Sequence, residues 1–395
     1  MILYILLDAF RGDYINLEKT PYLYSLTKNK GNYFVKNVIP SHSFCERTEI
    51  FSGLTPKESG FFTAIGYNPD LSPFKQFKFI LKFLHLFEKI ILINTLKKIF
   101  RKLISTLFNS IGLKMKIYNI PLNEVYYYYL TEDNIDIRYH EFESNIFKLI
   151  NSLNLKCFFK SFVSLSDSKN YSDKERLNMI LRNPKNDILF LYIGSPDAMG
   201  HTYGPESIIF QNYLKNLDNE LKEFIEYFDK INKRKSTIII NGDHGMSQVK
   251  FIFDVKKHLI KILNSKNYQI NKDYRLFFDS TLARIWSSNS ELLNFIRSDK
   301  KLNELGVFVY DDFDSKLKEI YGNLIWTINH SGLIIPNYFQ MTKIEGMHGY
   351  IPKKSSDYGT LIIKNPKFKH KKNKYIFLKD VHEILKNEIK SRFKN

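Results

Sequence analysis

Seven residues that could bind metal ions or act as a nucleophile are spread over five short segments of this chain. They are Asp8, Ser43, Asp197, His201, Asp243, His244 and His348. Zinc binds Asp oxygens and His nitrogens and keeps positions open for substrate. Two divalent ions can also clamp the attacking and leaving oxygens of a displacement at phosphorus. Because metal coordination activates a Ser hydroxyl, the set predicts a two-metal hydrolase with Ser43 as its nucleophile.

Each of these residues, taken alone, has a simpler structural explanation. An Asp that follows a strand is usually the N-cap of a helix. Asp197 and His201, four residues apart, fit a pair on a helix surface, and Asp243-His244 before Gly245 fits a turn. All of them together, in this order and each after a β-like run, are poorly explained by chance. We therefore interpret them as one site.

Continuous apolar runs of the kind found in buried parallel strands alternate with helical patterns. The sequence predicts strands at Ile2–Leu7, Phe34–Ile39, Ile188–Ile193, Thr237–Ile240 and Thr360–Ile363. It predicts helices at Tyr22–Leu26, Glu46–Phe51, Ile208–Phe228 and Val381–Ile389. This alternation favours an α/β fold, a mainly parallel sheet covered by helices on both faces, in a single domain over 1–395. The candidate ligands then fall at the carboxyl ends of strands, where such sheets place their sites.

Residues 67–140 interrupt the alternation, and we expect them to form an insertion. Apolar residues at helical spacing predict two basic amphipathic helices, Phe74–Ile93 and Leu96–Ile111. In the second helix, Lys97, Lys98, Arg101 and Lys102 lie opposite the apolar face. Residues 71–118 contain ten Lys and Arg against the single Glu88, a net charge of +9 in a chain of net charge +18. A local excess of this kind indicates an anionic partner.

Three roles for this insertion stay open. It could be a cap over the active site, with the apolar faces of its helices buried against each other. It could lie on an anionic membrane surface through residues 71–118, as basic amphipathic helices do. Nucleic-acid binding is the weakest alternative, because no recognition motif supports it. A transmembrane span is excluded, because Lys82, His85, Glu88 and Lys89 interrupt the apolar run.

The cysteine content and the N-terminal sequence bear on the compartment. Only Cys45 and Cys157 occur, so no disulfide framework is implied. The first apolar run is six residues long and ends at Asp8, which is too short for a signal sequence or a membrane span. We expect a cytoplasmic protein, with peripheral attachment to the membrane as an alternative.

The chain resembles the alkaline phosphatase superfamily, and within it the type I phosphodiesterase/nucleotide pyrophosphatase branch. The resemblance is carried by LLDAFRGDY, IPSHSFCERTEIFSGLTPKESG, GSPDAMGHTYGP, NGDHGMS and GMHGY. It implies two divalent metal ions, usually zinc, with manganese and iron as alternatives, and a covalent phospho-enzyme. It also implies that Asp8, Ser43, Asp243 and His244 surround one ion, and that Asp197, His201 and His348 surround the other.

The segment around Ser43 departs from that branch. Nucleotide pyrophosphatases usually carry Thr followed by Phe-Pro-Asn, whereas Ser43 is followed by Phe-Cys-Glu. We therefore expect Arg47 to hold a phosphate oxygen, since the guanidinium group suits that geometry. The Ser43-x-x-x-Arg47 spacing is similar to that of the related sulfatases. However, Cys45 stands where their Pro would be, so we do not expect Ser43 to mature to an aldehyde.

The leading functional hypothesis is hydrolysis of phosphodiester or pyrophosphate bonds through Ser43, on a nucleotide-type or lipid-linked substrate. The alternatives within the superfamily are a sulfatase and a phosphonate hydrolase. A hypothesis of another class is a membrane-surface scaffold with a vestigial site. The intact set of candidate ligands argues against that hypothesis.

Overall fold

The architecture comes from a computed structural model that describes residues 1–27, 32–36, 43–113, 115–131, 142–162, 171–233, 236–369 and 374–393. Its larger sheet has seven strands in the order β17-β2-β16-β7-β1-β6-β5. These strands are β1 (Ile2–Leu7), β2 (Asn32–Lys36), β5 (Cys157–Phe158), β6 (Ile188–Ile193), β7 (Thr237–Gly242), β16 (Gly359–Lys364) and β17 (Tyr375–Phe377). Within this sheet β16 pairs antiparallel with both of its neighbours, and the other pairings are parallel. The predicted mainly parallel α/β sheet is confirmed.

The register of the central strands places the candidate ligands side by side. Leu7, the last residue of β1, lies opposite Ile193 of β6 and Gly242 of β7. Because parallel strands end at the same edge, the residues that follow them share that edge. Asp8 and Asp243 therefore become neighbours, although 234 residues separate them in sequence.

Helices cover both faces of this sheet, because alternate residues of each buried strand point to opposite sides. One face packs against α2 (Ser43–Ser52), α6 (Ile146–Ser152) and α14 (Leu378–Phe393). The other packs against α1 (Pro21–Thr27), α7 (Asp173–Leu181) and α9 (Ile208–Ile231). Tyr4 and Leu6 enter the first core, whereas Leu3 and Ile5 enter the second. The predicted covering on both faces is thus confirmed.

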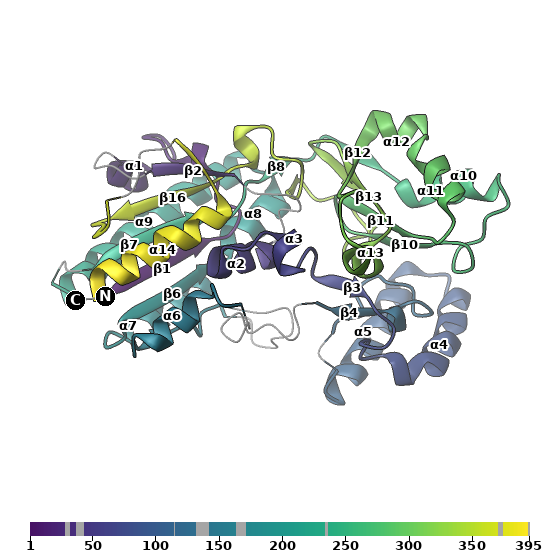
Figure 1. Cartoon of the computed structure of the whole chain (residues 1–395), viewed down its shortest axis with the longest axis horizontal. Coiled ribbons are helices and arrows are strands. Elements are labelled where there is room, and N and C mark those ends of the chain that lie inside the picture. Colours follow the sequence, from purple (N-terminus) through teal and green to yellow (C-terminus); the bar gives the residue numbers. More distant parts are fainter. Residues whose placement is uncertain are drawn as a thin grey trace.

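A second sheet, which the sequence patterns did not predict, lies beyond the carboxyl ends of the parallel strands (Figure 1). It is antiparallel, in the order β10-β11-β13-β12, and consists of β10 (Arg275–Phe278), β11 (Leu282–Trp286), β12 (Gly306–Val309) and β13 (Leu324–Ile328). The helices of this region are α10 (Val255–Asn264), α11 (Ser290–Arg297), α12 (Lys300–Leu305) and α13 (Ser315–Tyr321). Three two-stranded pairs complete the described strands: β3 (Ile65–Tyr67) with β4 (Tyr128–Leu130), β8 (Ser247–Gln248) with β15 (Gly346–Met347), and β9 (Phe251–Phe253) with β14 (Gly332–Ile334).

The insertion packs against this second sheet. Its two predicted helices are confirmed as α4 (Lys78–Ile90) and α5 (Asn94–Ser110), with the short 3-10 helix η2 (Lys75–Phe77) before them. The antiparallel pair β3–β4 brings the chain out and back at one place. Leu81, Ile104 and Phe108 share one apolar core with the second sheet.

Two details of the insertion differ from the prediction. Arg101 does not join an exposed basic face, because its guanidinium pairs with Glu88 of α4 inside the hairpin. The cap hypothesis required the apolar faces of the two helices to be buried against each other, but part of each face is exposed. Among the described residues, no helix combines the length and apolar character needed to cross a bilayer.

Candidate metal centre

Asp8, Asp243 and His244 form the first cluster of potential ligands, at the ends of β1 and β7. Their donor atoms lie within 4.8 Å of one another. One oxygen of Asp243, Oδ1, accepts hydrogen bonds from the backbone N–H groups of Ala9 and His244, each 3.0 Å long. Gly242 permits this crossing of the two chain segments, because a Cβ atom there would lie 2.0 Å from the carbonyl oxygen of Phe10. The Asp243 carboxylate is thus fixed against the β1 loop.

The imidazole of His244 faces carboxylates through its Nε2 atom. Nε2 lies 3.3 Å from Asp8 Oδ1, 3.5 Å from Glu46 Oε2 and 3.9 Å from Asp243 Oδ1. Nδ1 lies 2.8 Å from the carbonyl oxygen of Gly245, to which it can only donate a proton. A neutral His244 therefore directs the lone pair of Nε2 toward the carboxylates, as a histidine that ligates a metal does.

Burial and charge strongly affect the acid–base behaviour of this cluster. Burial raises the pKa of Asp243 to about 7, with the charge of Asp8 adding to the effect and His244 and Arg47 opposing it. Burial by itself would lower the pKa of His244, but Glu46, Asp243 and Asp8 raise it well above its usual value. The concentrated negative charge thus favours a cation at this place.

Asp197, His201 and His348 form the second cluster, whose donor atoms also lie within 4.8 Å of one another. Asp197 and His201 lie one turn apart on α8 (Ser195–Tyr203), and His348 follows β15. Asp197 Oδ1 is 3.1 Å from His201 Nε2 and 3.5 Å from His348 Nε2. His201 Nδ1 lies 2.8 Å from the carbonyl oxygen of Gly346, so Nε2 is again the atom left to bind a ligand.

The two clusters are adjacent. The rings of His244 and His348 stack with their centroids 4.1 Å apart, and one of these residues belongs to each cluster.

Within the second cluster, burial would raise the pKa of Asp197, but the two histidines hold it well below its usual range. Burial would lower the pKa of His201, but Asp197 raises it.

The spacing of the donor atoms suits metal ions. Ligands about 2.0–2.2 Å from a tetrahedral ion are roughly 3.3–3.6 Å from each other. The separations of 3.1, 3.3 and 3.5 Å found in the two clusters are close to this range. The residues therefore fit two divalent cations, and the six Asp and His residues divide as the family resemblance implies, whereas its assignment of Ser43 to the first group stays a prediction.

The position of Ser43 is given by its helix. Ser43 is the first residue of α2, and its side chain lies outside the described residues, as does His42. Arg47, the predicted phosphate contact, is buried, with its guanidinium carbon 4.8 Å from the centroid of the Tyr192 ring. Its charge opposes the rise in the pKa of Asp243, which places it within electrostatic reach of the first cluster.

Two residues of the site were not predicted from the sequence. Glu46, one turn into α2, is buried and faces His244. Tyr192 of β6 donates its hydroxyl proton to Asp8 Oδ2. Burial raises the pKa of Tyr192 well above its usual value, so this hydroxyl stays a donor. The single hydroxyl-bearing side chain within the apolar run of β6 was the signal that could have pointed to Tyr192.

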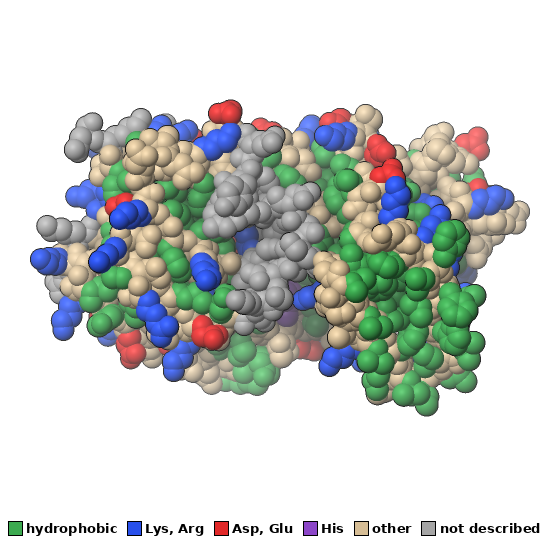
Figure 2. Space-filling model, turned by 90° about the horizontal axis from the view of Figure 1, so that it is seen from below, with side chains coloured by type: hydrophobic (Ala, Val, Ile, Leu, Met, Phe, Trp, Pro, Cys, Tyr) green, Lys and Arg blue, Asp and Glu red, His purple; other side chains and the backbone are tan. Residues whose placement is uncertain are grey.

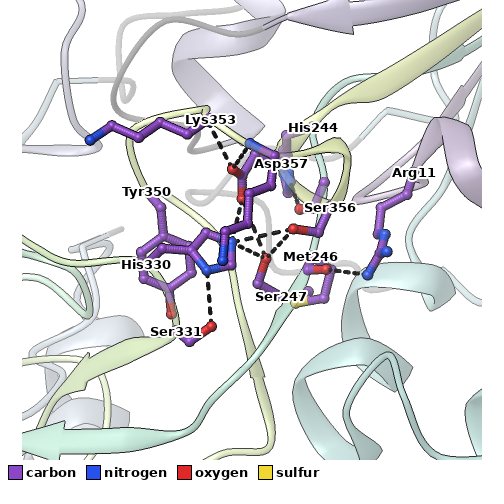
Figure 3. A network of polar contacts seen from close by, with 12 residues as sticks. Arg11, His244, Met246, Ser247, His330, Ser331, Tyr350, Lys353, Ser356 and Asp357 are labelled. Atoms are coloured by element: carbon purple, nitrogen blue, oxygen red, sulfur yellow. Dashed lines mark hydrogen bonds and ion pairs between the residues drawn. The ribbon is translucent and has the colours of Figure 1, made fainter.

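A hydrogen-bonded network supports the loop that follows Asp243 (Figure 3). His330 Nε2 lies 2.9 Å from Ser247 Oγ and 2.8 Å from Asp357 Oδ1. Because both partners meet the same ring nitrogen, these three residues are not arranged as a catalytic triad, in which the Asp contacts the other nitrogen. Arg11 pairs with Asp13 and donates to the carbonyl oxygen of Met246 at 3.0 Å, so it joins the loop after β1 to the loop after β7.

Comparisons with known proteins agree with this fold. Murine ectonucleotide pyrophosphatase / phosphodiesterase 5 superposes with a TM-score of 0.65 at 15% identity, covering 97% of this chain and 93% of that protein. An inactive variant of it, solved in complex with AMP, gives 0.66 at 15% identity, with 98% and 94% covered. The human protein gives 0.63 at 16% identity, with 97% and 93% covered. At this level of identity the likeness shows a shared fold.

Shorter stretches match two bacterial phosphatases. Alkaline phosphatase PhoV of Synechococcus elongatus is 36% identical over 64 residues, 16% of this chain and 12% of that protein. Alkaline phosphatase PafA of Elizabethkingia meningoseptica is 28% identical over 120 residues, 24% of this chain and 22% of that protein. The sequence pattern of the family described as Type I phosphodiesterase / nucleotide pyrophosphatase matches residues 2–351. The chain therefore belongs to the type I phosphodiesterase/nucleotide pyrophosphatase family, within the alkaline phosphatase superfamily.

Proposed function

We propose that this protein hydrolyses phosphodiester or pyrophosphate bonds with two divalent metal ions, zinc being the first candidate, and with Ser43 as its nucleophile. The observation that carries the proposal is the pair of adjacent Asp/His clusters at the edge of the sheet. In one cluster Asp8, Asp243 and His244 would hold an ion, and in the other Asp197, His201 and His348 would. Metal ions bound there would activate the Ser hydroxyl and stabilise charge on the phosphate oxygens.

In the proposed reaction, Ser43 Oγ attacks phosphorus, and its proton passes through solvent to the oxygen of the leaving alcohol or phosphate. The bond from phosphorus to the leaving alcohol or phosphate breaks, which gives a phosphoserine and the first product. Water then cleaves the phosphoserine bond and restores the Ser43 hydroxyl. Ser43 begins α2, and the N-terminus of a helix favours an anionic phosphate group. The buried Arg47 adds positive charge on the same helix and is the proposed partner of a phosphate oxygen.

A nucleotide-type substrate is the first candidate, since the family includes nucleotide pyrophosphatases and one solved structural relative holds AMP. A lipid-linked phosphodiester is the second candidate, and the exposed apolar side chains of the α4–α5 hairpin favour it. The two classes can be compared by measuring turnover of a dinucleoside pyrophosphate and of a lipid phosphodiester under the same conditions.

The activity is tested with bis-p-nitrophenyl phosphate. We expect turnover that a chelator abolishes and added zinc or manganese restores. Ser43→Ala and Asp243→Asn should lower kcat by at least two orders of magnitude, because each removes a group that acts in the transition state. Wild-type rates in either variant would refute the proposed mechanism.

The alternatives are separated by substrate and by metal content. An aryl sulfate or an aryl phosphonate as the best substrate in a panel with mono- and diesters would replace the diester assignment. Fewer than one metal ion per chain after mild purification, together with absent turnover, would favour a scaffold with a vestigial site.

A further inference from the structure

The hairpin formed by α4 and α5 carries an extended apolar surface that nothing in the described chain covers. Phe79 is 82% exposed and Leu92, between the helices, is 88% exposed. The other members of this outer surface are Ile80, Phe83, Leu86, Phe87, Ile90, Ile93, Leu96, Ile99, Leu103, Leu107 and Ile111. Figure 2 shows these hydrophobic side chains gathered at one end of the molecule. A continuous apolar patch of this kind marks an interaction surface.

The hairpin does not need a partner to fold, because its inner side is already packed. Phe108 makes edge-on ring contacts with Phe74 and Phe77, at centroid distances of 5.2 and 5.1 Å. Leu81 and Ile104 are buried in the same core. The outer apolar surface is therefore a preformed platform and is not left over from an incomplete core.

Polar contacts inside the hairpin join its two helices. Arg101 forms a two-pronged ion pair with Glu88. It also donates to the carbonyl oxygens of Tyr118 and Ile120, at 3.1 and 2.9 Å. This arrangement neutralises the only acidic side chain of residues 71–118, so the remaining charge of the segment is entirely basic.

Lysines border the outer apolar surface along both helices. Lys82, Lys89, Lys98 and Lys102 are exposed. Within the described ranges, no carboxylate pairs with any of these four ammonium groups. At helical spacing, Lys82 and Lys89 lie beside the row that contains Phe79, Phe83, Leu86 and Ile90. Apolar side chains between lysines are the pattern of helices that lie in the headgroup region of a bilayer.

We propose that the α4–α5 hairpin inserts its outer apolar surface into one leaflet of a bilayer that contains anionic lipid. The lysines then meet the headgroup phosphates. The helices have 13 and 17 residues, or about 20 and 26 Å at 1.5 Å per residue, so they lie in the interface and do not cross it. A second copy of this chain is a poorer occupant, because it would bring lysines against lysines with no carboxylate to pair them. The proposal does not depend on the enzymatic activity.

Vesicle flotation tests the electrostatic part. The full-length protein should float with phosphatidylcholine vesicles that contain phosphatidylglycerol, float less with phosphatidylcholine alone, and be released as salt rises. Replacing Lys82, Lys98 and Lys102 by Gln should weaken partitioning by about 100-fold. The matched control replaces three exposed lysines of α9, Lys215, Lys222 and Lys230, and should bind like the wild type. Equal effects of the two triple variants would overturn the role of this surface.

A tryptophan reporter tests insertion. The native Trp286 and Trp326 are buried, so their emission should not respond to vesicles. Phe83→Trp should shift its emission to shorter wavelength with anionic vesicles and be quenched by lipids brominated in the acyl chains. Ile252→Trp, at a position with 55% exposure against 59% for Phe83, should show neither effect.

Two outcomes would overturn the proposal. In the first, the emission of Phe83→Trp stays unchanged in the presence of anionic vesicles. In the second, the wild type sediments as a dimer, and the Phe79→Ser and Leu103→Ser variants sediment as monomers. Neither the wild type nor either variant then floats with vesicles. That result would assign the surface to a second copy of the chain. Turnover of the soluble diester in each variant verifies that the protein has folded, because none of these residues belongs to the metal centre.

Discussion

Replacing Glu49 by Gln should stabilise this protein at neutral and alkaline pH. Glu49 lies on α2, the helix that begins with Ser43, and is 2% exposed. Burial raises the pKa of its carboxyl from 4.5 to about 8; Lys379 opposes this rise, and Glu58 and Asp380 add to it. The folded protein therefore keeps a proton on Glu49 that the unfolded chain has already lost at pH 7.

The sign and size of the effect follow from linkage. Because folding raises this pKa, the stability contributed by Glu49 is fully present below pH 4.5 and is lost as the pH rises toward 8. At about 1.4 kcal/mol for each tenfold change in proton affinity, the loss is on the order of 3 kcal/mol at pH 7. Gln resembles the protonated carboxyl in shape and does not ionise, so the variant should avoid this loss.

Chemical denaturation between pH 4.5 and 9 measures the effect. The free energy of unfolding of Glu49→Gln should equal that of the wild type near pH 4.5 and exceed it increasingly up to about pH 8. Glu220→Gln, an exposed glutamate of α9, is the control and should follow the wild-type curve. Diester turnover should be retained, since Glu49 contacts no candidate ligand in the described structure. A difference that does not change with pH, or a less stable variant at pH 8, would refute the reasoning.

Two further predictions concern the candidate metal centre and the second sheet. Tyr192→Phe removes the hydrogen bond to Asp8. In metal-buffered assays, the zinc concentration for half-maximal activity should therefore rise about 10- to 100-fold, while kcat at saturating zinc stays near normal. An unchanged zinc dependence would contradict this prediction. Arg284→Met strips the buried Asp279 of its 2.9 Å ion pair and Ile65 of a 2.7 Å hydrogen bond, and should cost about 3–5 kcal/mol of folding free energy. The double variant with Asp279→Leu should recover part of that loss in denaturant titrations, and a fully additive loss would rule out the unpaired charge as its cause.

The central sheet was predictable because its strands are nearly pure apolar runs. Ile2–Leu7 and Ile188–Ile193 were predicted at the bounds that the structure gives, and Thr237–Ile240 was two residues short of β7. The prediction for Phe34–Ile39 was displaced, since β2 spans Asn32–Lys36. Residues 37–40 lie outside the described part of the chain.

The second sheet was not predictable in the same way. Its strands are four or five residues long, and one of them carries Arg284 at its centre, fully buried. From the local sequence alone, an arginine in a strand is expected to be exposed at the surface. Its burial depends on Asp279, on the carbonyl of Ile65 more than 200 residues away, and on the ring of Phe277, 4.3 Å from the guanidinium carbon. Asp279 and Phe277 belong to the same β10–β11 hairpin as Arg284, but Ile65 is brought to it only by the tertiary fold.

The same limit separates the candidate site residues that sequence patterns identified from those they missed. The seven candidate residues have side chains that metal chemistry requires, and all but His201, in the last turn of α8, lie after a strand or near the start of a helix. Glu46 and Tyr192 have no such pattern, because their roles depend on which other residues they face. Glu46 belongs to the site because it faces His244, and Tyr192 belongs to it because its hydroxyl donates to Asp8.

The α4–α5 hairpin shows what the periodicity of apolar residues can predict and what it cannot. Apolar residues at helical spacing predicted both helices, but the spacing cannot tell a row that meets a core from a row that meets solvent. In α5, Ile104 and Phe108 are buried, whereas Leu103 and Leu107, each one residue earlier, are 59% and 67% exposed. One residue along a helix is a rotation of about 100°, so adjacent positions belong to different surfaces. The basic residues of the segment are divided between the same two surfaces. Arg101 faces inward to Glu88, whereas Lys98 and Lys102 are exposed on the outside. The proposed binding to an anionic bilayer would need no refolding of the hairpin, because its inner side is packed and a second apolar row lies exposed between lysines.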